Sequence, residues 1–474
     1  MKKEIVVYFD DTDAYQIDIA NPNKMVEKFS QQSPKMNLII VTFQPDLLIN
    51  YIGEDLCLCD ILDFECLDKQ IRQSVGLDEP KGKWSVPNML SAYLDIEEKS
   101  WDYEDRFELM KLLANCYVRM RELGAGEWER IEKIEIPVNK ILYKAQFDGL
   151  YFKNEGIEPL CSELHRKIYG YKNKIQLELG FTGDDLESYL RLKSIEYGNL
   201  DDNEVRHLCI ERPELEPFRK IRNHKRNLNC LISLSAVRDG SNLCKPLFKG
   251  FGSSTGRIFM RDPSLQNLNR KYRSLLRKEP LPDDYRYVYV DFGQFEAGIL
   301  AGLSDNEKLK DLYENDGIYE KLLSMSNLTD SDLAKTAFYC FVYGGIIWKG
   351  TESFFAEFGL KNIIDKVKCE ASENGYVQTK LGNKRMKKNE SDTKWIMNHY
   401  IQGNSSLIFK QALIDVHQQF GSKVALQIPM HDAALYIVHS DVTTESIIDT
   451  FKNAFTKWIP DCKPVVKEKD FFND

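Results

Sequence analysis

The sequence predicts an α/β protein of more than one domain, with the candidate chemistry after residue 250. The chain has 474 residues, more than one hydrophobic core usually organises, and 43% of them are hydrophobic, so several cores can be filled. Strand-like and helical patterns also alternate along much of the sequence. The net charge of −9 argues against a protein that coats nucleic acid over its whole surface, because such proteins are usually basic.

Three consecutive stretches differ in their patterns. Residues 1–120 combine strand-like runs with a helical one, which predicts a small α/β domain. Residues 137–250 are mostly helical, polar and charged. From residue 252 onward, strands rich in β-branched and aromatic residues mix with long helices. The predicted strands are 5–9, 38–42, 285–292, 424–430 and 434–438, and a helix is predicted over 106–121.

Composition predicts a cytoplasmic protein without a membrane segment. The apolar run 5–9 ends at Asp10, so it is far shorter than a signal or membrane-spanning segment. The eleven cysteines show no paired CxxC spacing, which favours reduced thiols. Lysine and arginine concentrate at 219–226, 270–278 and 380–388, so a basic channel in an acidic body is feasible, although charge runs are usually only solvated faces.

Two carboxylates stand where strands end. Asp291 closes the mostly apolar run 285–290, and Asp432 lies between two strand-like runs that meet in a tight turn. If these strands are neighbours, the two carboxylates converge, and a pair of hard anionic oxygens on rigid strands suits two Mg²⁺ ions in phosphoryl transfer. A single Asp at a strand end is more often a turn residue, so the pair needs further support.

That support comes from a predicted helix that begins within 329–332 and ends at Gly344 and Gly345. Lys335, Tyr339 and Tyr343 are four residues apart and so project from one face of this helix. One cation followed by two aromatic rings complements a nucleoside triphosphate. The alternative is an ordinary amphipathic helix with its aromatic residues in the core.

Three segments follow one another in a fixed order: Asp291-Phe-Gly-Gln294-Phe-Glu296, then Lys335 with Tyr343-Gly344, then His431-Asp432-Ala433. They resemble the first palm motif, the fingers motif and the His-Asp-Glu motif of family A DNA polymerases, the DNA polymerase I family. Ser254-Thr-Gly-Arg257, Leu265-Gln266-Asn267, Gly375-Tyr-Val-Gln-Thr-Lys-Leu-Gly382, Asn398 and Gln402 match further segments of that family. Agreement of several motifs in order argues against chance.

The resemblance implies a function and a role for each matching residue. The chain would copy a primed DNA template with dNTPs and Mg²⁺, for which Mn²⁺ could substitute, in a bacterial or phage-infected cell. Asp291 and Asp432 would be the metal ligands, and Lys335 would hold the triphosphate. Gln294, Glu296, Tyr339 and Tyr343 would lie at the nucleotide, with Glu296 excluding ribonucleotides. Primer-template contacts would come from Arg257, Gln266, Asn267, Asn398, Gln402 and His431.

Three positions depart from the family pattern near this site. Ser331 stands where the family usually has an Arg that grips the triphosphate, so we expect Ser331→Arg to tighten dNTP binding. Ala433 replaces the third-motif Glu, which is peripheral to the two Asp ligands, and we expect activity to survive. Lys394 replaces an Arg, which keeps the charge but loses the planar fork.

The N-terminal domain resembles the family's 3′-5′ exonuclease domain more loosely. Asp10 and Asp46 match two of its acidic metal ligands, whereas Thr12 and Asn115 stand where the other two are expected. Thr42 and Lys111 likewise depart from the second and third motifs. Because a hydroxyl or an amide supplies no negative charge to the metals, we expect little or no proofreading. Asp11, Asp13 or Asp105 could restore a ligand under a shifted alignment.

The resemblance thus implies an RNase H-like, degenerate exonuclease domain followed by a right-hand polymerase with palm, fingers and thumb. The boundaries expected are 1–130 for the exonuclease-like domain, 131–250 for the thumb and the start of the palm, and 251–474 for palm and fingers, with the fingers at about 303–395. Two alternatives remain: a template-independent or RNA-templated nucleotidyltransferase on the same fold, and a non-catalytic nucleic-acid-binding relative.

Overall fold

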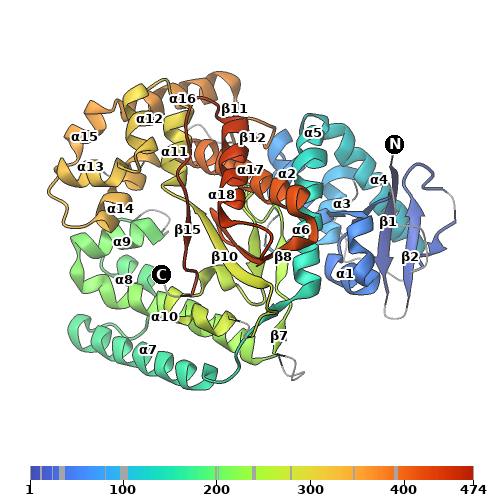
Figure 1. Ribbon diagram of the computed structural model, residues 1–474, viewed down its shortest axis with the longest axis horizontal. Helices are drawn as coiled ribbons and strands as arrows, with labels where there is room; N and C mark the ends of the chain where they lie inside the picture. Colours follow the sequence, from blue (N-terminus) through green and yellow to red (C-terminus); the bar gives the residue numbers. More distant parts are fainter. Residues whose placement is uncertain are drawn as a thin grey trace.

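The computed structural model describes most of the chain, and three successive parts can be followed in it (Figure 1). The described residues are 2–10, 13–23, 25–30, 38–80, 82–94, 96, 105–197, 200, 202–237, 242–277, 280–344, 347–388 and 393–472. Asp11, Thr12 and Gly345 lie outside them, as does Lys278 at the end of a basic run.

The first part is built on a five-stranded sheet with the order β3-β2-β1-β4-β5. Its strands are β1 (Lys3–Phe9), β2 (Ala14–Asp18), β3 (Glu27–Lys28), β4 (Leu38–Thr42) and β5 (Asp60–Asp63). The strands β1, β4 and β5 are parallel, whereas β2 is antiparallel to β1 and to β3. The predicted strands at 5–9 and 38–42 are thereby confirmed.

Helices bury both faces of this sheet. Val6 and Val41 pack against helices on one side, whereas Val7 and Ile40 face a second cluster on the other, as the twofold periodicity of strands requires. Asp63 caps α2 by accepting a hydrogen bond from the Glu65 amide at 2.9 Å. The helices are α1 (Pro45–Ile52), α2 (Phe64–Val75), α3 (Val86–Leu94) and α4 (Arg106–Leu123).

The middle part is helical, as the polar and charged pattern predicts. Helices α7 and α10 pack against each other at the lower left of Figure 1, and α8 and α9 lie next to them. The helices here are α5 (Trp128–Arg130), α6 (Ile136–Asp148), α7 (Ile157–Leu179), α8 (Leu186–Leu192), α9 (Asp202–Glu211) and α10 (Glu216–Ser235). Short strand pairs, β6 (Leu150–Tyr151) with β7 (Leu243–Cys244) and β8 (Leu247–Lys249) with β9 (Phe259–Arg261), lead into the last part.

The last part surrounds a four-stranded antiparallel sheet with the order β13-β14-β10-β15. The strands are β10 (Tyr285–Phe292), β13 (Val424–Pro429), β14 (Ala433–His439) and β15 (Val466–Lys469). Between β10 and β13 lie α11 (Phe295–Gly302), α12 (Glu307–Glu314), α13 (Ile318–Ser324), α14 (Ser331–Val342), α15 (Glu352–Glu357), α16 (Leu360–Asn374), the pair β11 (Tyr376–Val377) and β12 (Arg385–Met386), and α17 (Lys394–Phe420). Helix α18 (Thr444–Trp458) follows β14.

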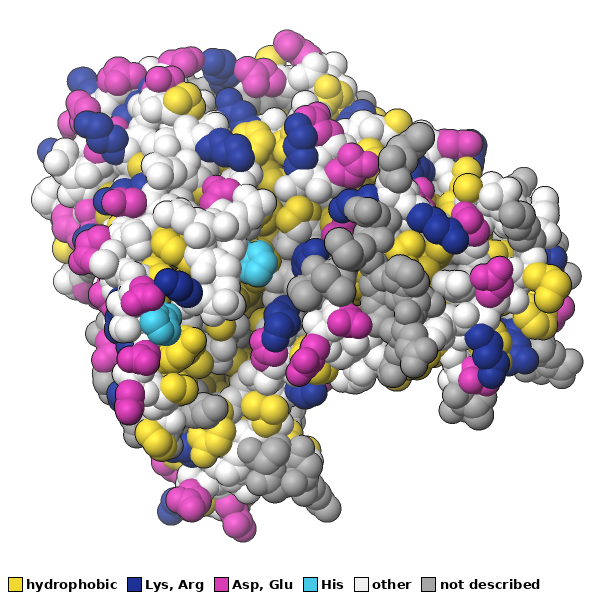
Figure 2. Space-filling model, turned by 45° about the vertical axis from the view of Figure 1, so that its right-hand side comes forward, with side chains coloured by type: hydrophobic (Ala, Val, Ile, Leu, Met, Phe, Trp, Pro, Cys, Tyr) yellow, Lys and Arg dark blue, Asp and Glu magenta, His cyan; other side chains and the backbone are white. Residues whose placement is uncertain are grey.

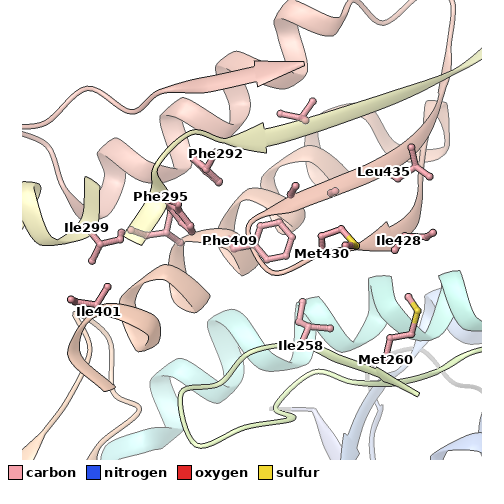
Figure 3. Packing of buried hydrophobic residues seen from close by; sticks show 14 of the residues in the cluster. Ile258, Met260, Phe292, Phe295, Ile299, Ile401, Phe409, Ile428, Met430 and Leu435 are labelled. Atoms are coloured by element: carbon pink, nitrogen blue, oxygen red, sulfur yellow. The ribbon is translucent and has the colours of Figure 1, made fainter. Parts of the chain in front are cut away.

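The core under this sheet fixes the positions of the strands that carry the candidate site. Figure 3 shows apolar side chains of β10, β13, β14, α11 and α17 close to one another, with Ile258 and Met260 on the segment that faces them. The rings of Phe292 and Phe295 stack with centroids 4.2 Å apart and planes 9° from parallel. This packing continues without a break into the helical middle part, because the buried residues of both belong to one cluster.

The surface carries charges of both signs. Figure 2 shows acidic and basic side chains interspersed over one face of the molecule. Within the described parts of the chain, no helix is both long and apolar enough to cross a bilayer. The ten cysteine side chains that the structure describes are free thiols, as the absence of CxxC spacing predicts.

Candidate active site

Asp291 and Asp432 come together because their strands are hydrogen-bonded neighbours. Strands β10 and β14 are antiparallel, and their register places Asp291 opposite Ala433. The Phe292 amide donates to the Asp432 carbonyl oxygen at 3.1 Å, so the pairing continues into the turn before β14. The Met430 amide donates to the Ala433 carbonyl oxygen at 2.7 Å and closes that tight turn. The predicted convergence of these two residues is therefore present.

The two carboxylates form one electrostatic unit. Burial raises the pKa of Asp291 to about 6, and the negative charge of Asp432 contributes to the shift. The pKa of Asp432 is also raised, because little water reaches its carboxylate and Glu296 adds negative charge. Lys469 of β15 forms an ion pair with Asp291 and partly offsets the shift. Two desolvated carboxylates side by side favour a cation between them.

Helix α14 places a cation and two aromatic rings near this pair. Asp330 caps the helix by accepting a hydrogen bond from the Leu333 amide at 2.8 Å. Lys335 is exposed, and its positive charge lowers the pKa of both Asp291 and Asp432. The rings of Tyr339 and Tyr343 stack with centroids 5.8 Å apart and planes 11° from parallel. The alternative of an all-core aromatic helix fits less well, because both tyrosines are only half-buried.

Glu296 connects three elements at the site. It lies in the first turn of α11, accepts a hydrogen bond from the Tyr343 hydroxyl, and forms an ion pair with Arg257. The backbone amide of Arg257 donates a hydrogen bond to the Ser253 hydroxyl at 3.2 Å, in the loop that leads to Arg257. Burial, together with the negative charge of Glu296, raises the pKa of Tyr343, so its hydroxyl stays protonated and can donate.

Gln294 turns the chain from β10 into α11. Its backbone has a φ of +47°, in the left-handed region that residues other than glycine seldom adopt. The Gln294 side-chain amide donates to the carbonyl and to the carboxylate Oδ1 of Asp316, both at 2.8 Å. Gln294 is therefore held toward the segment before α13 and helps to place Glu296 two residues later.

The residues expected at the primer-template divide into two groups. The side-chain amide of Gln266 donates to the backbone carbonyls of Ile258 and Pro429, at 3.1 and 2.9 Å, so it joins the 257–261 segment to the strand before the Asp432 turn. Asn267 is exposed, although its amide donates to the Ser264 hydroxyl at 2.8 Å. Gln266 thus has a bridging position, whereas Asn267 stays available for contact.

The other group lies on α17 and in the turn before β14. Asn398 has a buried Oδ1 with no hydrogen-bond partner among the described residues. Gln402, one turn further along the helix, lies beside the Tyr343 hydroxyl and lowers the pKa of that group. His431 is exposed in the turn directly before Asp432. Gln402 thus lies at Tyr343 and His431 next to Asp432, and Asn398 is one turn from Gln402 on α17.

The basic runs differ in how much charge they present. In α10, Arg219 pairs with Glu216 at 2.5 Å, Lys225 with Asp184 at 2.9 Å and Arg226 with Asp202 at 2.6 Å. These partners neutralise much of the charge on the 219–226 run. The 380–388 run lies instead around β12, next to the start of α17.

The three positions that depart from the family pattern differ in burial. Ser331 is exposed as the first residue of α14, and Asp332 beside it lies 3.8 Å from Arg206 of α9. Ala433 is fully buried opposite Asp291, so a longer side chain there would need the neighbouring packing to move. Lys394 is exposed at the first position of α17.

Of the two aspartates that the sequence matches to exonuclease metal ligands, Asp10 is paired with an arginine. Arg106 of α4 pairs with Asp10 at 2.5 Å and lies over the Tyr15 ring at 4.4 Å. Asp46 accepts a hydrogen bond from the Gln146 side-chain amide at 2.9 Å. Lys111 and Asn115 lie on α4, whereas Thr12 is outside the described residues. Asp10 and Asp46 thus already have protein partners.

Three contributors were missed from the sequence. Lys469 lies on a short polar strand with no apolar pattern, and nothing in its spacing indicates that it meets Asp291. The sequence predicts Arg106 only as the start of a helix. Tyr319 of α13 donates a hydrogen bond to the Tyr339 hydroxyl at 2.8 Å, a contact between helices that periodicity does not predict. Pairing of this kind depends on long-range topology.

The acidic side chains do not form a closed metal cage. Among residues that the structure describes, no group of three or more His, Cys, Asp or Glu side chains is arranged to hold a metal ion. The Asp291 and Asp432 pair nevertheless fits a divalent ion that is shared with a phosphate ligand, because hard cations of this type are often held by one or two carboxylates plus substrate oxygens.

Comparison with known proteins adds sequence and fold similarity. No family model matches the chain. The chain is 24% identical to a DNA polymerase I of Caldicellulosiruptor bescii over 457 residues, covering 83% of this chain and 53% of that protein. It is 24% identical to the DNA polymerase I of Bacillus caldotenax over 371 residues, covering 66% and 42%, and 27% identical to a DNA polymerase of Mycobacterium phage L5 over 247 residues, covering 49% and 40%.

A solved structure has a similar fold over the whole chain. The POL domain of Pol1 from M. smegmatis, in complex with DNA primer-template and dNTP, matches with a TM-score of 0.74 and 17% identity, covering 100% of this chain and 95% of that one. The chain spans about half the length of the curated relatives it matches.

Proposed function

We propose that this chain, which belongs to the DNA polymerase I family, is a DNA-directed DNA polymerase that adds dNTPs to the 3′ end of a primer. The observation that carries the proposal is the convergence of Asp291 and Asp432, on adjacent strands, with Lys335 on the helix nearby. A carboxylate pair faced by a lysine suits a reaction in which a triphosphate is held and cleaved. Primed DNA and dNTPs are the partners that follow from it.

The architecture suggests how the three parts divide the work. Residues 1–130 would be a degenerate 3′-5′ exonuclease domain, because the β3-β2-β1-β4-β5 order, with β2 alone antiparallel to its neighbour β1, fits an RNase H-like sheet. Residues 131–250 would form the thumb and the start of the palm, and 251–474 the palm and fingers. The fingers, at about 303–395, contain α14.

The residues present fit a two-metal site. Asp291 and Asp432 would hold the ions, and Mg²⁺ bound there would stabilise the attacking and leaving oxygens of the transfer. Burial, together with neighbouring negative charge, raises the pKa of both carboxylates, and a bound cation would offset both effects, which supports this assignment. Lys469 now offsets part of that charge by pairing with Asp291.

The chain's own residues would bind and orient the nucleotide. Lys335 would bind the triphosphate through charge-assisted hydrogen bonds, and Tyr339 would pack beside the sugar. Tyr343 would stack at the templating base, with its hydroxyl anchored on Glu296. Glu296, itself held by Arg257, would occupy the space next to the 2′ carbon and so exclude a ribose hydroxyl.

We propose that the exonuclease-like part does not proofread. Arg106 places a guanidinium on Asp10, where a catalytic metal would otherwise be required, and Asp46 is bound by Gln146. An arginine can neutralise a carboxylate, but it supplies neither a polarised water nor Lewis acidity.

Primer extension tests the function and its alternatives together. Each dNTP would be supplied singly with a primed DNA template and with a primed RNA template of the same sequence. We expect incorporation of the complementary nucleotide on DNA, and loss of it in Asp432→Ala. Extension that ignores the template would indicate a template-independent transferase. Extension on the RNA template alone would indicate an RNA-templated enzyme, and binding without extension would indicate a non-catalytic relative.

A further inference from the structure

A cavity of about 510 Å³ lies between the first part of the chain and the segments around α17. One wall comes from α2 and the residues that follow it, including Lys69 and Trp84. The opposite wall comes from the 252–254 segment, β12 and the start of α17, including Arg385 and Trp395. The cavity therefore exists only because the exonuclease-like part packs against the rest of the chain.

The described lining combines aromatic rings with cations. It contains two indole rings, Trp84 and Trp395, and the guanidinium of Arg385 lies over the Trp395 ring at 4.9 Å. The indole N–H of Trp84 donates to Asp68 at 3.0 Å, which fixes that ring. Aromatic faces beside cations are the chemistry that binds an unpaired base together with its phosphate, because stacking tolerates any base.

The charge balance of the described lining favours an anion. Four basic and two acidic side chains line the cavity, and one of the basic ones, Arg72, is already paired with the buried Asp68 at 2.7 Å. Glu65 is itself neutralised, by Lys249 at 3.0 Å and by Lys69 at 2.9 Å, and these lysines lower its pKa to about 2 against the opposing effect of burial. Lys388, at the other wall, is exposed. The cations that this lining offers to a phosphate are therefore Arg385 and Lys388, on a chain whose net charge is −9.

The cavity is continuous with the elements proposed to hold the primer-template. Trp395 lies on α17 three residues before Asn398, and the 252–254 segment leads directly into Arg257. Gln73 of α2 locks the two walls together, since its side-chain amide donates to the Ser254 carbonyl at 3.0 Å and to Asn383 Oδ1 at 2.8 Å. A strand leaving the primer-template site along α17 would thus meet this cavity.

We propose that this cavity binds an unpaired nucleotide of single-stranded DNA next to the duplex, with its base on Trp395 and its phosphate at Lys388 and Arg385. The inference rests on the proposed function, because it takes primed DNA as the ligand. The unpaired segment has two sources, the 5′ overhang of the template or a frayed 3′ end of the primer. In either case the degenerate exonuclease part contributes a binding wall to the polymerase.

Equilibrium binding tests this site without any catalysis. Fluorescence anisotropy would give the Kd of the full chain, without dNTPs, for three DNAs: a blunt duplex, the same duplex with a 5′ overhang, and the same duplex with an unpaired 3′ tail. The variants are Trp395→Ala, Trp395→Phe and Lys388→Gln. Lys452→Gln is the matched control, because its side chain is 43% exposed and 3.3 Å from Asp449, whereas that of Lys388 is 42% exposed and 3.7 Å from Asp78.

We expect Trp395→Ala to raise the Kd for one tailed DNA about tenfold and to leave the blunt duplex unchanged, with Trp395→Phe restoring most of the loss. The tailed DNA that loses affinity identifies the source of the strand. Lys388→Gln should lower the slope of log Kd against log salt concentration for that same DNA by about one, whereas Lys452→Gln should leave the slope unchanged. Because Lys388 is exposed, this arm stays informative even if Trp395→Ala does not fold.

Two results would overturn the proposal. One is an equal Kd of the unaltered chain for blunt and tailed DNA, and the other is a loss of the same size for Lys388→Gln and Lys452→Gln. Failure of the polymerase function would look different: selective binding of tailed DNA would persist with no nucleotide incorporated in the primer-extension assay.

Discussion

The Tyr343 hydroxyl donates a hydrogen bond to the carboxylate of Glu296, which joins the end of α14 to the first turn of α11. Arg257 holds the same carboxylate through an ion pair. The residue proposed to read the sugar is therefore fixed by the residue proposed to stack at the templating base. Movement of α14 on nucleotide binding would also change the environment of Glu296.

Replacing Glu296 should relax discrimination against ribonucleotides. We expect Glu296→Ala to raise the ratio of kcat/KM for ATP to that for dATP by at least about tenfold, because the side chain no longer occupies the space beside the 2′ carbon. Tyr343→Phe, which removes only the hydroxyl, should change this ratio less. An unchanged ratio in Glu296→Ala would show that another group excludes the 2′ hydroxyl.

Tyr339 should make the enzyme tolerant of dideoxynucleotides, since its hydroxyl can take the place of the missing 3′ hydroxyl. We therefore expect Tyr339→Phe to discriminate more strongly against ddNTPs in chain-termination assays. Tyr319→Phe is the control, because it removes the hydroxyl that donates to Tyr339 at 2.8 Å but keeps the Tyr339 hydroxyl itself. Equal discrimination by the unaltered chain and by Tyr339→Phe would refute the assignment.

Proofreading should be absent. A primer with a mismatched, labelled 3′ end should stay intact in Mg²⁺ without dNTPs, and Asp10→Ala should behave like the unaltered chain, because Arg106 already occupies the Asp10 carboxylate. Metal-dependent release of the 3′ nucleotide that Asp10→Ala abolishes, and that Asp432→Ala preserves, would overturn this prediction.

The buried His399 should make stability depend on pH. Burial lowers the pKa of His399 to about 4, and its Nε2 lies 2.6 Å from the Asn383 carbonyl oxygen. The unfolded chain binds a proton at this residue near pH 6.5, so stability is full above that pH and is lost as the pH falls toward 4. Between pH 7 and 5 the loss amounts to about 2 kcal/mol.

His399→Gln isolates this contribution, because all other titrating groups are shared. Thermal unfolding at pH 7 and at pH 5 should show that the unaltered chain loses more stability than His399→Gln over this interval. Equal losses in the two proteins would mean that His399 is protonated in the folded state as readily as in the unfolded one.

The sequence predicted elements best where one pattern decides them. Strand β10 was predicted at its observed bounds, because a mostly apolar run of aromatic and β-branched residues that leads to Asp291 leaves little choice. Helix α14 begins at Ser331, within the stretch where the capping residues placed its start. The meeting of Asp291 with Asp432 followed from the resemblance and from the assumption that their strands are neighbours, which the sheet order bears out.

The contacts that set the charge of the site were not predictable in this way. Lys469 reaches Asp291 from a strand 178 residues further along the chain, and Arg106 reaches Asp10 from a helix 96 residues away. The pairing of such side chains depends on which elements become neighbours, and neither periodicity nor local composition encodes that. The cavity between Trp84 and Trp395 was not predictable either, because its walls come from segments that are far apart in the sequence.

Single-nucleotide incorporation on four templates that differ only in the templating base would show whether the chain copies DNA. We expect each template to accept its complementary dNTP. We also expect Asp432→Asn, which keeps the shape but removes the charge, to lower the rate by at least about a hundredfold while still binding the primed template. Incorporation of the same nucleotide on all four templates, or an unchanged rate in Asp432→Asn, would contradict these expectations.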